Sequence, residues 1–82
     1  MLFHITQRHR PEDCPLGKGG SRSLFDADST DVEIKGYWLA FPAHTVYLVV
    51  ETDDIAKLHA FLKPGALVTT SEITPVSPTP VT

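Results

Sequence analysis

The strongest constraint on the fold is the order of elements in the last two-thirds of the chain. Two apolar, β-prone runs cover residues 32–41 and 44–51 and are separated by a short turn. A helix-like stretch follows at 53–63, and a last strand-like run covers 66–76. With the opening run at 1–7, the expected order is strand, irregular segment, strand, strand, helix, strand. This order predicts an α+β fold.

The order matches the split-βαβ, or ferredoxin-like, arrangement with a four-stranded antiparallel sheet. We expect a single domain over residues 1–76, followed by an extended proline-rich tail, SPTPVT, at 77–82. The first helix of such a fold is expected to be short or replaced by loop, because HRPEDCPLGKGG contains two prolines and three glycines. SRSLFDAD (21–28) is expected to form a short helix with Ser21 as its N-cap. One face of so small a sheet then needs a partner or a ligand.

Apolar spacing gives two expectations about packing. In the helix, Ile55, Leu58 and Leu62 form the inner stripe, with His59 beside them. The strand at 32–41 is apolar on both faces towards its end, which predicts that it is covered on both sides.

Composition narrows the classes of partner. The chain has 82 residues, which is near the lower end of what folds alone, so we expect a homodimer. The net charge of −3 argues against nucleic acid as a partner. The single cysteine cannot form an intrachain disulfide, which favours the reducing cytoplasm. No apolar run approaches the ~20 residues of a membrane span, and we expect no signal peptide.

Short motifs resemble those of the dimeric α/β-barrel superfamily, in particular its small muconolactone isomerase-like proteins. The resemblance rests on MLFHI, IKGYW, DDIAKLHAFL and SEITPVSP. It implies that two ferredoxin-like chains pack sheet against sheet, with a pocket between each sheet and its loops. The chain departs from that pattern where the first helix would lie, and no catalytic residue is carried over from the family.

A pocket on the open sheet face is the first candidate site. His4 titrates near neutrality and is expected to act with Glu72 in general acid–base chemistry. Tyr47 and one of Tyr37 or Trp38 are expected to form aromatic walls. These walls suit a small aromatic or lactone-like molecule.

The segment GKGGSR (17–22) is a second candidate for ligand contact. Its glycines, with Lys18 and Arg22, are able to form a backbone nest for a phosphate or carboxylate. The alternative is a lid over the pocket, formed by residues 8–22.

A metal site is the alternative to a site without metal. His4, His9, Cys14 and His44 carry imidazole and thiolate ligands for zinc, copper or iron. His4 and His44 belong to strands that are neighbours in a ferredoxin-like sheet, and His9 and Cys14 are expected in the loop after the first strand. No tight ligand spacing such as CxxC accompanies them. The competing interpretation makes His44 a strand cap and His9 a surface residue.

Three hypotheses about function follow. The first is a small cytoplasmic, cofactor-independent enzyme or binder of a small organic molecule, with isomerase-type proton transfer if it is an enzyme. The second is a non-catalytic accessory subunit that binds a larger protein. The third is a metal-binding protein that uses His4, His9, Cys14 and His44.

Overall fold

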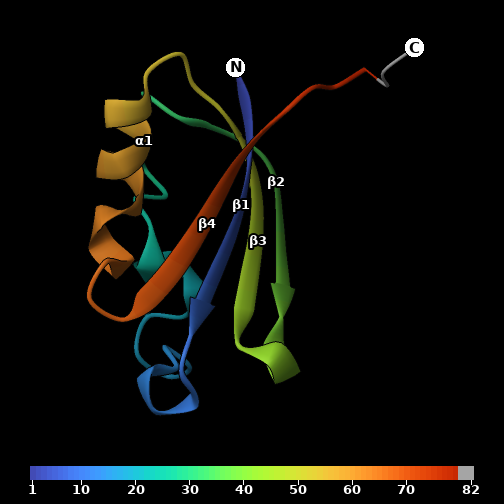
Figure 1. Cartoon of the computed structure of the whole chain (residues 1–82). Helices are drawn as coiled ribbons and strands as arrows, with labels where there is room; N and C mark the ends of the chain where they lie inside the picture. Colours follow the sequence, from blue (N-terminus) through green and yellow to red (C-terminus); the bar gives the residue numbers. More distant parts are fainter. Residues whose placement is uncertain (80–82) are drawn as a thin grey trace.

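The computed structural model describes residues 1–79. Of the tail expected at 77–82, residues 80–82 lie outside the described residues. The chain has four strands, one α-helix and four 3-10 segments (Figure 1). In chain order these are β1 (Leu2–His9), η1 (Pro11–Asp13), η2 (Ser21–Leu24), β2 (Glu33–Ala40), η3 (Phe41–Ala43), β3 (Thr45–Glu51), α1 (Ile55–Leu62), η4 (Lys63–Gly65) and β4 (Thr69–Val76).

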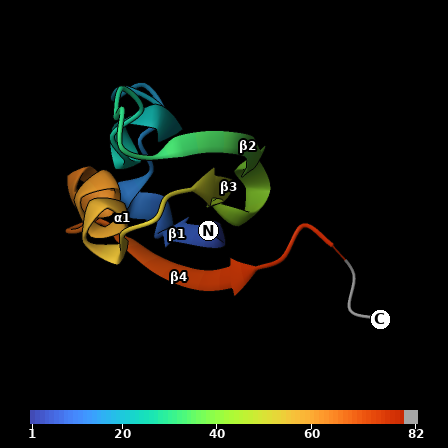
Figure 2. The ribbon, with the colours of Figure 1, turned by 90° about the horizontal axis from the view of Figure 1, so that it is seen from above.

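The four strands form one antiparallel sheet in the order β2-β3-β1-β4. The central strand β1 pairs on both sides, so that Ile5 lies opposite Leu48 of β3 and Ile73 of β4. This arrangement confirms the α+β, ferredoxin-like expectation. The sheet of one chain is open and is not a closed barrel (Figures 1 and 2).

The expected loss of the first helix is also confirmed. Between β1 and β2 the described chain forms only the 3-10 segments η1 and η2. The helix expected at 21–28 is limited to η2, and its N-cap is Gly20 rather than Ser21. Leu24 and Phe25 are nevertheless buried at 3% exposure each, so this segment covers the sheet as a helix would.

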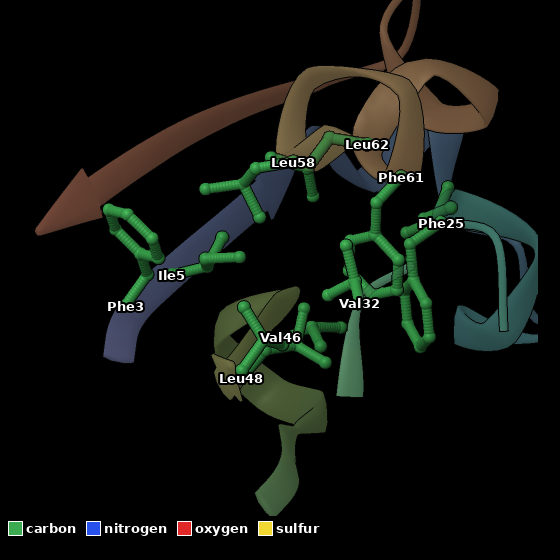
Figure 3. Packing of buried hydrophobic residues seen from close by; sticks show 11 residues of the cluster. Phe3, Ile5, Phe25, Val32, Val46, Leu48, Leu58, Phe61 and Leu62 are labelled. Atoms are coloured by element: carbon green, nitrogen blue, oxygen red, sulfur yellow. The ribbon is translucent and has the colours of Figure 1, made fainter. Parts of the chain in front are cut away.

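The hydrophobic core lies on the face of the sheet that α1 covers (Figure 3). Asp54 caps α1 by accepting a hydrogen bond from the Ala56 amide at 2.8 Å. The expected helix stripe is partly wrong, because Ile55 in the first turn is 50% exposed and His59 is also exposed, whereas Phe61 is buried. The core residues are Phe3, Ile5, Leu24, Phe25, Val32, Val46, Leu48, Val50, Leu58, Phe61 and Leu62.

The backbone of Leu24 fixes the η2 segment to the rest of the fold. Gln7 is fully buried in β1, and its side-chain amide donates to the Leu24 carbonyl at 2.8 Å. Gly65 packs so closely on the same residue that an added Cβ would lie 3.1 Å from Leu24 Cα. The residue at position 65 must therefore be glycine for this contact to persist.

The other face of the sheet is uncovered. Figure 2 shows α1 and the 3-10 segments η1 and η2 gathered on one side of the strands. The edge strand β2 is largely exposed, and Trp38 is 56% exposed, so residues 1–79 of one chain cover only one side of this strand. Among residues 1–79, no helix combines the length and the apolar character that crossing a membrane would require.

Candidate metal centre

Three of the four residues of the expected metal set meet at one end of the sheet. The ligand atoms of His9, Cys14 and His44 all lie within 4.8 Å of one another. These residues come from the end of β1, from the loop after η1, and from the position between η3 and β3. His44 comes 35 positions after His9 and 30 after Cys14, so only the fold brings it to the other two.

The pairing of β1 with its neighbours places the two histidines. The His9 amide donates to the His44 carbonyl at 3.1 Å, and the two rings meet edge to face with centroids 5.2 Å apart. His9 also pairs with Thr69 of β4, which extends β1 to its last residue. The expectation that His9 lies in the loop after the first strand was therefore wrong.

The third ligand is carried by a short, tied loop. The η1 turn ends at Cys14, whose amide donates to the Pro11 carbonyl at 3.2 Å. Arg10 holds the turn from outside, at 2.9 Å from Asp13 and 3.1 Å from Glu12. The thiol therefore has a defined position although it lies in a loop.

His44 has an uncommon backbone conformation. Its φ of 50° and ψ of 45° are in the left-handed region, where His is among the enriched non-glycine residues. Its amide donates to the Phe41 carbonyl at 3.1 Å and closes the turn between β2 and β3. This turn directs the imidazole of His44 towards His9.

The imidazole nitrogens lack partners. Both ring nitrogens of His9 and the Nδ1 of His44 are buried and accept or donate no hydrogen bond within residues 1–79. Burial, and then the neighbouring His44, lower the pKa of His9 below its ordinary value of 6.5, while Asp13 partly offsets the shift. His9 is therefore neutral near pH 7, which is the form that binds metal ions.

The donor set fits a zinc ion. Tetrahedral zinc with nitrogen and sulfur ligands places its donor atoms about 3.3–3.8 Å apart. The donors here lie within 4.8 Å, so small rotations of the side chains bring them to that spacing. Coordination would also give one buried nitrogen of each histidine a partner, and an unpartnered buried polar atom otherwise costs about 1–3 kcal/mol.

The three donors line a cavity with apolar walls. Its volume is about 190 Å³. Leu16, Leu39 and Phe41, each more than half exposed, stand around it. The other residues that line it are Pro15, Gly20 and Ser21.

His4 does not join this cluster. His4 and His9 are five positions apart on one strand, and side chains separated by an odd number of positions point to opposite faces. His4 therefore lies on the uncovered face, where its ring centroid is 6.2 Å from that of Tyr47. The structure thus divides the expected set of four into a group of three and one separate histidine.

The two aromatic wall candidates of β2 point to opposite faces. Trp38 lies opposite Tyr47 on the uncovered face. Tyr37 lies on the covered side, where its hydroxyl bonds to Ser21 and its ring packs 5.7 Å from Phe25. Of the alternatives Tyr37 and Trp38, only Trp38 shares a face with His4.

The remaining expected site residues are exposed. Glu72 lies on the uncovered face and forms an ion pair with Arg8 at 3.3 Å. Its side chain is 68% exposed in one chain. Lys18 and Arg22 are exposed in the loop before β2 and line none of the cavity at His9.

Sequence reasoning did not place Leu16, Leu39 and Phe41 at a site. Phe41 is 51% exposed in one chain. A signal was present, because Phe41 and His44 flank the same short turn and so must lie near one another. Their ring centroids are 6.1 Å apart.

Comparisons with known proteins give a family without a described activity. No curated protein and no solved structure matches the chain, and no muconolactone isomerase homologue is shown. One family model, described as "Domain of unknown function (DUF3303)", matches residues 1–80. Because the match covers nearly the whole chain, the protein belongs to the DUF3303 family.

Proposed function

We propose that this protein binds one zinc ion through His9, Cys14 and His44. The observation that supports this best is that the donor atoms of two imidazoles and one thiol lie within 4.8 Å of one another. The unpartnered, buried nitrogens of His9 and His44 support it further, because buried polar atoms in native proteins have partners in nearly all cases. Three protein ligands leave the fourth position open, as in zinc sites that act on other molecules.

Thiolate ligation adds conditions to this function. Cys14 must stay reduced to bind the ion, which is consistent with the reducing cytoplasm that we propose as its location. We expect weaker binding than at a structural four-ligand site, because one ligand fewer holds the ion.

Metal analysis of the purified chain tests the assignment. The chain is prepared without chelators, its metal content is measured by mass spectrometry, and zinc affinity is measured by competition with a chromophoric chelator. We expect one zinc per chain. Cys14→Ser and His44→Asn should each weaken binding more than about 100-fold, which is more than the usual loss when a residue that only supports a ligand is changed. Asn suits the left-handed backbone at position 44 but is too short to replace the imidazole.

Two matched controls make the result specific. His4→Gln removes the histidine on the opposite face, and His59→Gln removes the exposed histidine on α1. Both variants should keep the affinity of the parent chain. Stoichiometric copper or iron, no metal at all, or equal losses in His4→Gln would contradict the assignment.

The uncovered sheet face supports a second proposal, a homodimer formed through this face. The observation in its favour is that Trp38, on the edge strand β2, is 56% exposed. It lies on a face that carries no helix within residues 1–79. His4, Tyr47 and Glu72 share this face, so the small-molecule pocket expected from them would lie between the two copies.

Light scattering coupled to size-exclusion chromatography tests the dimer. We expect the mass of two chains, and Trp38→Glu should return the mass to that of one chain. Leu67→Glu, which changes a residue that is 99% exposed outside the sheet, serves as the control. A single-chain mass for the parent protein would contradict the dimer.

A further inference from the structure

The cavity at the candidate zinc ligands has the walls of a ligand site. Leu16, Leu39 and Phe41 are 68%, 52% and 51% exposed, and all three line the cavity that holds the metal donors. Single exposed apolar side chains need no explanation, but a group of them around one concave site indicates binding. An occupant with an apolar body would remove these surfaces from water.

Within residues 1–79, no acidic side chain lines the cavity that holds the three donors. Asp13 is near enough to influence the pKa of His9, but it pairs with Arg10 at 2.9 Å and does not belong to the group of donor atoms within 4.8 Å of one another. Water or an external ligand is therefore favoured at the open position of the metal.

Charge determines which external ligand is favoured. A zinc ion with one thiolate and two neutral imidazoles carries a net charge of +1. An unbalanced charge between apolar walls is costly because the surrounding medium has a low dielectric constant. A donor group with a single negative charge brings the site to neutrality, whereas a neutral donor does not.

Volume limits the body of that ligand. A dry cavity of about 150 Å³ is known to hold one benzene molecule. The cavity here has about 190 Å³, which leaves room for one ring and a small donor group. We propose, building on the zinc assignment, that the site binds a small organic monoanion, with its donor on the metal and its ring-sized apolar body against Leu16, Leu39 and Phe41.

Cobalt substitution allows metal and ligand to be observed separately. The full chain is loaded with Co²⁺, whose thiolate charge-transfer band reports that Cys14 holds the metal. The visible bands of Co²⁺ report exchange of the fourth ligand when benzoate is added. Acetate has the same donor without the ring, and benzamide has the ring without the charge.

We expect benzoate to bind at least tenfold more tightly than acetate or benzamide. Phe41→Ala should weaken benzoate at least fivefold, and the thiolate band in the same sample shows whether the metal is still held. If Phe41→Ala does not fold, Phe41→Leu takes its place in the experiment. Leu67→Ala, at a 99% exposed position, should bind benzoate as the parent chain does.

Each contrary result has a distinct meaning. A thiolate band without any response to benzoate overturns the monoanion site and leaves the zinc assignment in place. Acetate or benzamide binding as tightly as benzoate, or no loss in Phe41→Ala, does the same. Absence of the thiolate band overturns the zinc assignment and the ligand site together.

Discussion

The indole ring of Trp38 lies against the backbone of Gly36 on the uncovered face of β2. A Cβ built at position 36 would be 2.7 Å from Cζ3 of the indole, closer than real carbon contacts allow. Residues two positions apart on a strand share a face, and the lack of a side chain at Gly36 allows the ring to fold back along β2. The chain has one tryptophan, so its fluorescence reports this contact directly.

Gly36→Ala should therefore displace the indole into water. We expect a red shift of the tryptophan emission at a dilution at which the chain is monomeric. The cost in unfolding free energy should stay below about 1 kcal/mol, because the end of an exposed side chain can move. Lys35→Ala, at the neighbouring exposed position, is the control and should leave the emission unchanged. An unshifted spectrum in Gly36→Ala would show that the ring does not rest on this glycine.

A second glycine has a backbone neighbour that cannot move away. A Cβ at Gly65 would collide with the carbonyl oxygen of Leu24 and come within 3.1 Å of its Cα. Gly65→Ala should lower the unfolding free energy by about 1–3 kcal/mol, the usual range for overpacking a close contact. Urea unfolding measures this loss, and Ala66→Ser at the exposed next position should change stability by less than about 0.5 kcal/mol. Equal midpoints for the two variants would contradict the tight packing at Leu24.

His9 gives the metal-free chain a dependence of stability on pH. Burial and His44 hold the pKa of His9 in the folded chain below the 6.5 of an exposed histidine, against a smaller opposite effect of Asp13. Well above pH 6.5, His9 is neutral in both the folded and the unfolded chain, and its contribution to the unfolding free energy is fully present. As the pH falls below 6.5, the unfolded chain takes up the proton more readily, so the unfolding free energy decreases until the folded pKa is passed.

Urea unfolding with a chelator at pH 7.5 and pH 5.0 checks this sign. His9→Gln should reduce the difference between the two conditions, while His59→Gln, at an exposed position on α1, should not. If His9→Gln shows the same loss at pH 5.0 as the parent chain, another group is responsible for the pH dependence.

The strands and the helix were predictable because each has a clear local pattern. Alternation and turn residues located β1 to β4 to within a few positions, and Asp54 and Pro64 bracketed α1. Local pattern did not show that β1 continues to His9, because this extension depends on pairing with Thr69 about 60 positions away. Whether a strand lies at the edge of a sheet also depends on pairing between distant parts of the chain. Local pattern therefore did not show that one side of β2 lacks cover from the chain itself.

The candidate site was predictable as a set of residue types and not as a geometry. His9, Cys14 and His44 stood in the expected set because imidazole and thiolate are metal ligands wherever they occur. His4 can be removed from the set only when His9 is known to lie in the same strand. The two residues are then an odd number of positions apart, so their side chains point to opposite faces of the sheet. The apolar walls depended on the turn at Phe41, whose side chain has no periodic pattern to place it.

Zinc binding should make thermal stability depend on metal concentration. A ligand that binds only the folded chain adds about 2.7 kcal/mol at a free concentration 100 times its Kd. In a domain of this size that corresponds to a rise in Tm of roughly 10–20 °C. Cys14→Ser removes the thiolate without changing the loop, and it should show almost no rise with zinc. A shift of the same size in Cys14→Ser, or none in the parent chain, would mean that the three donors do not hold the ion together.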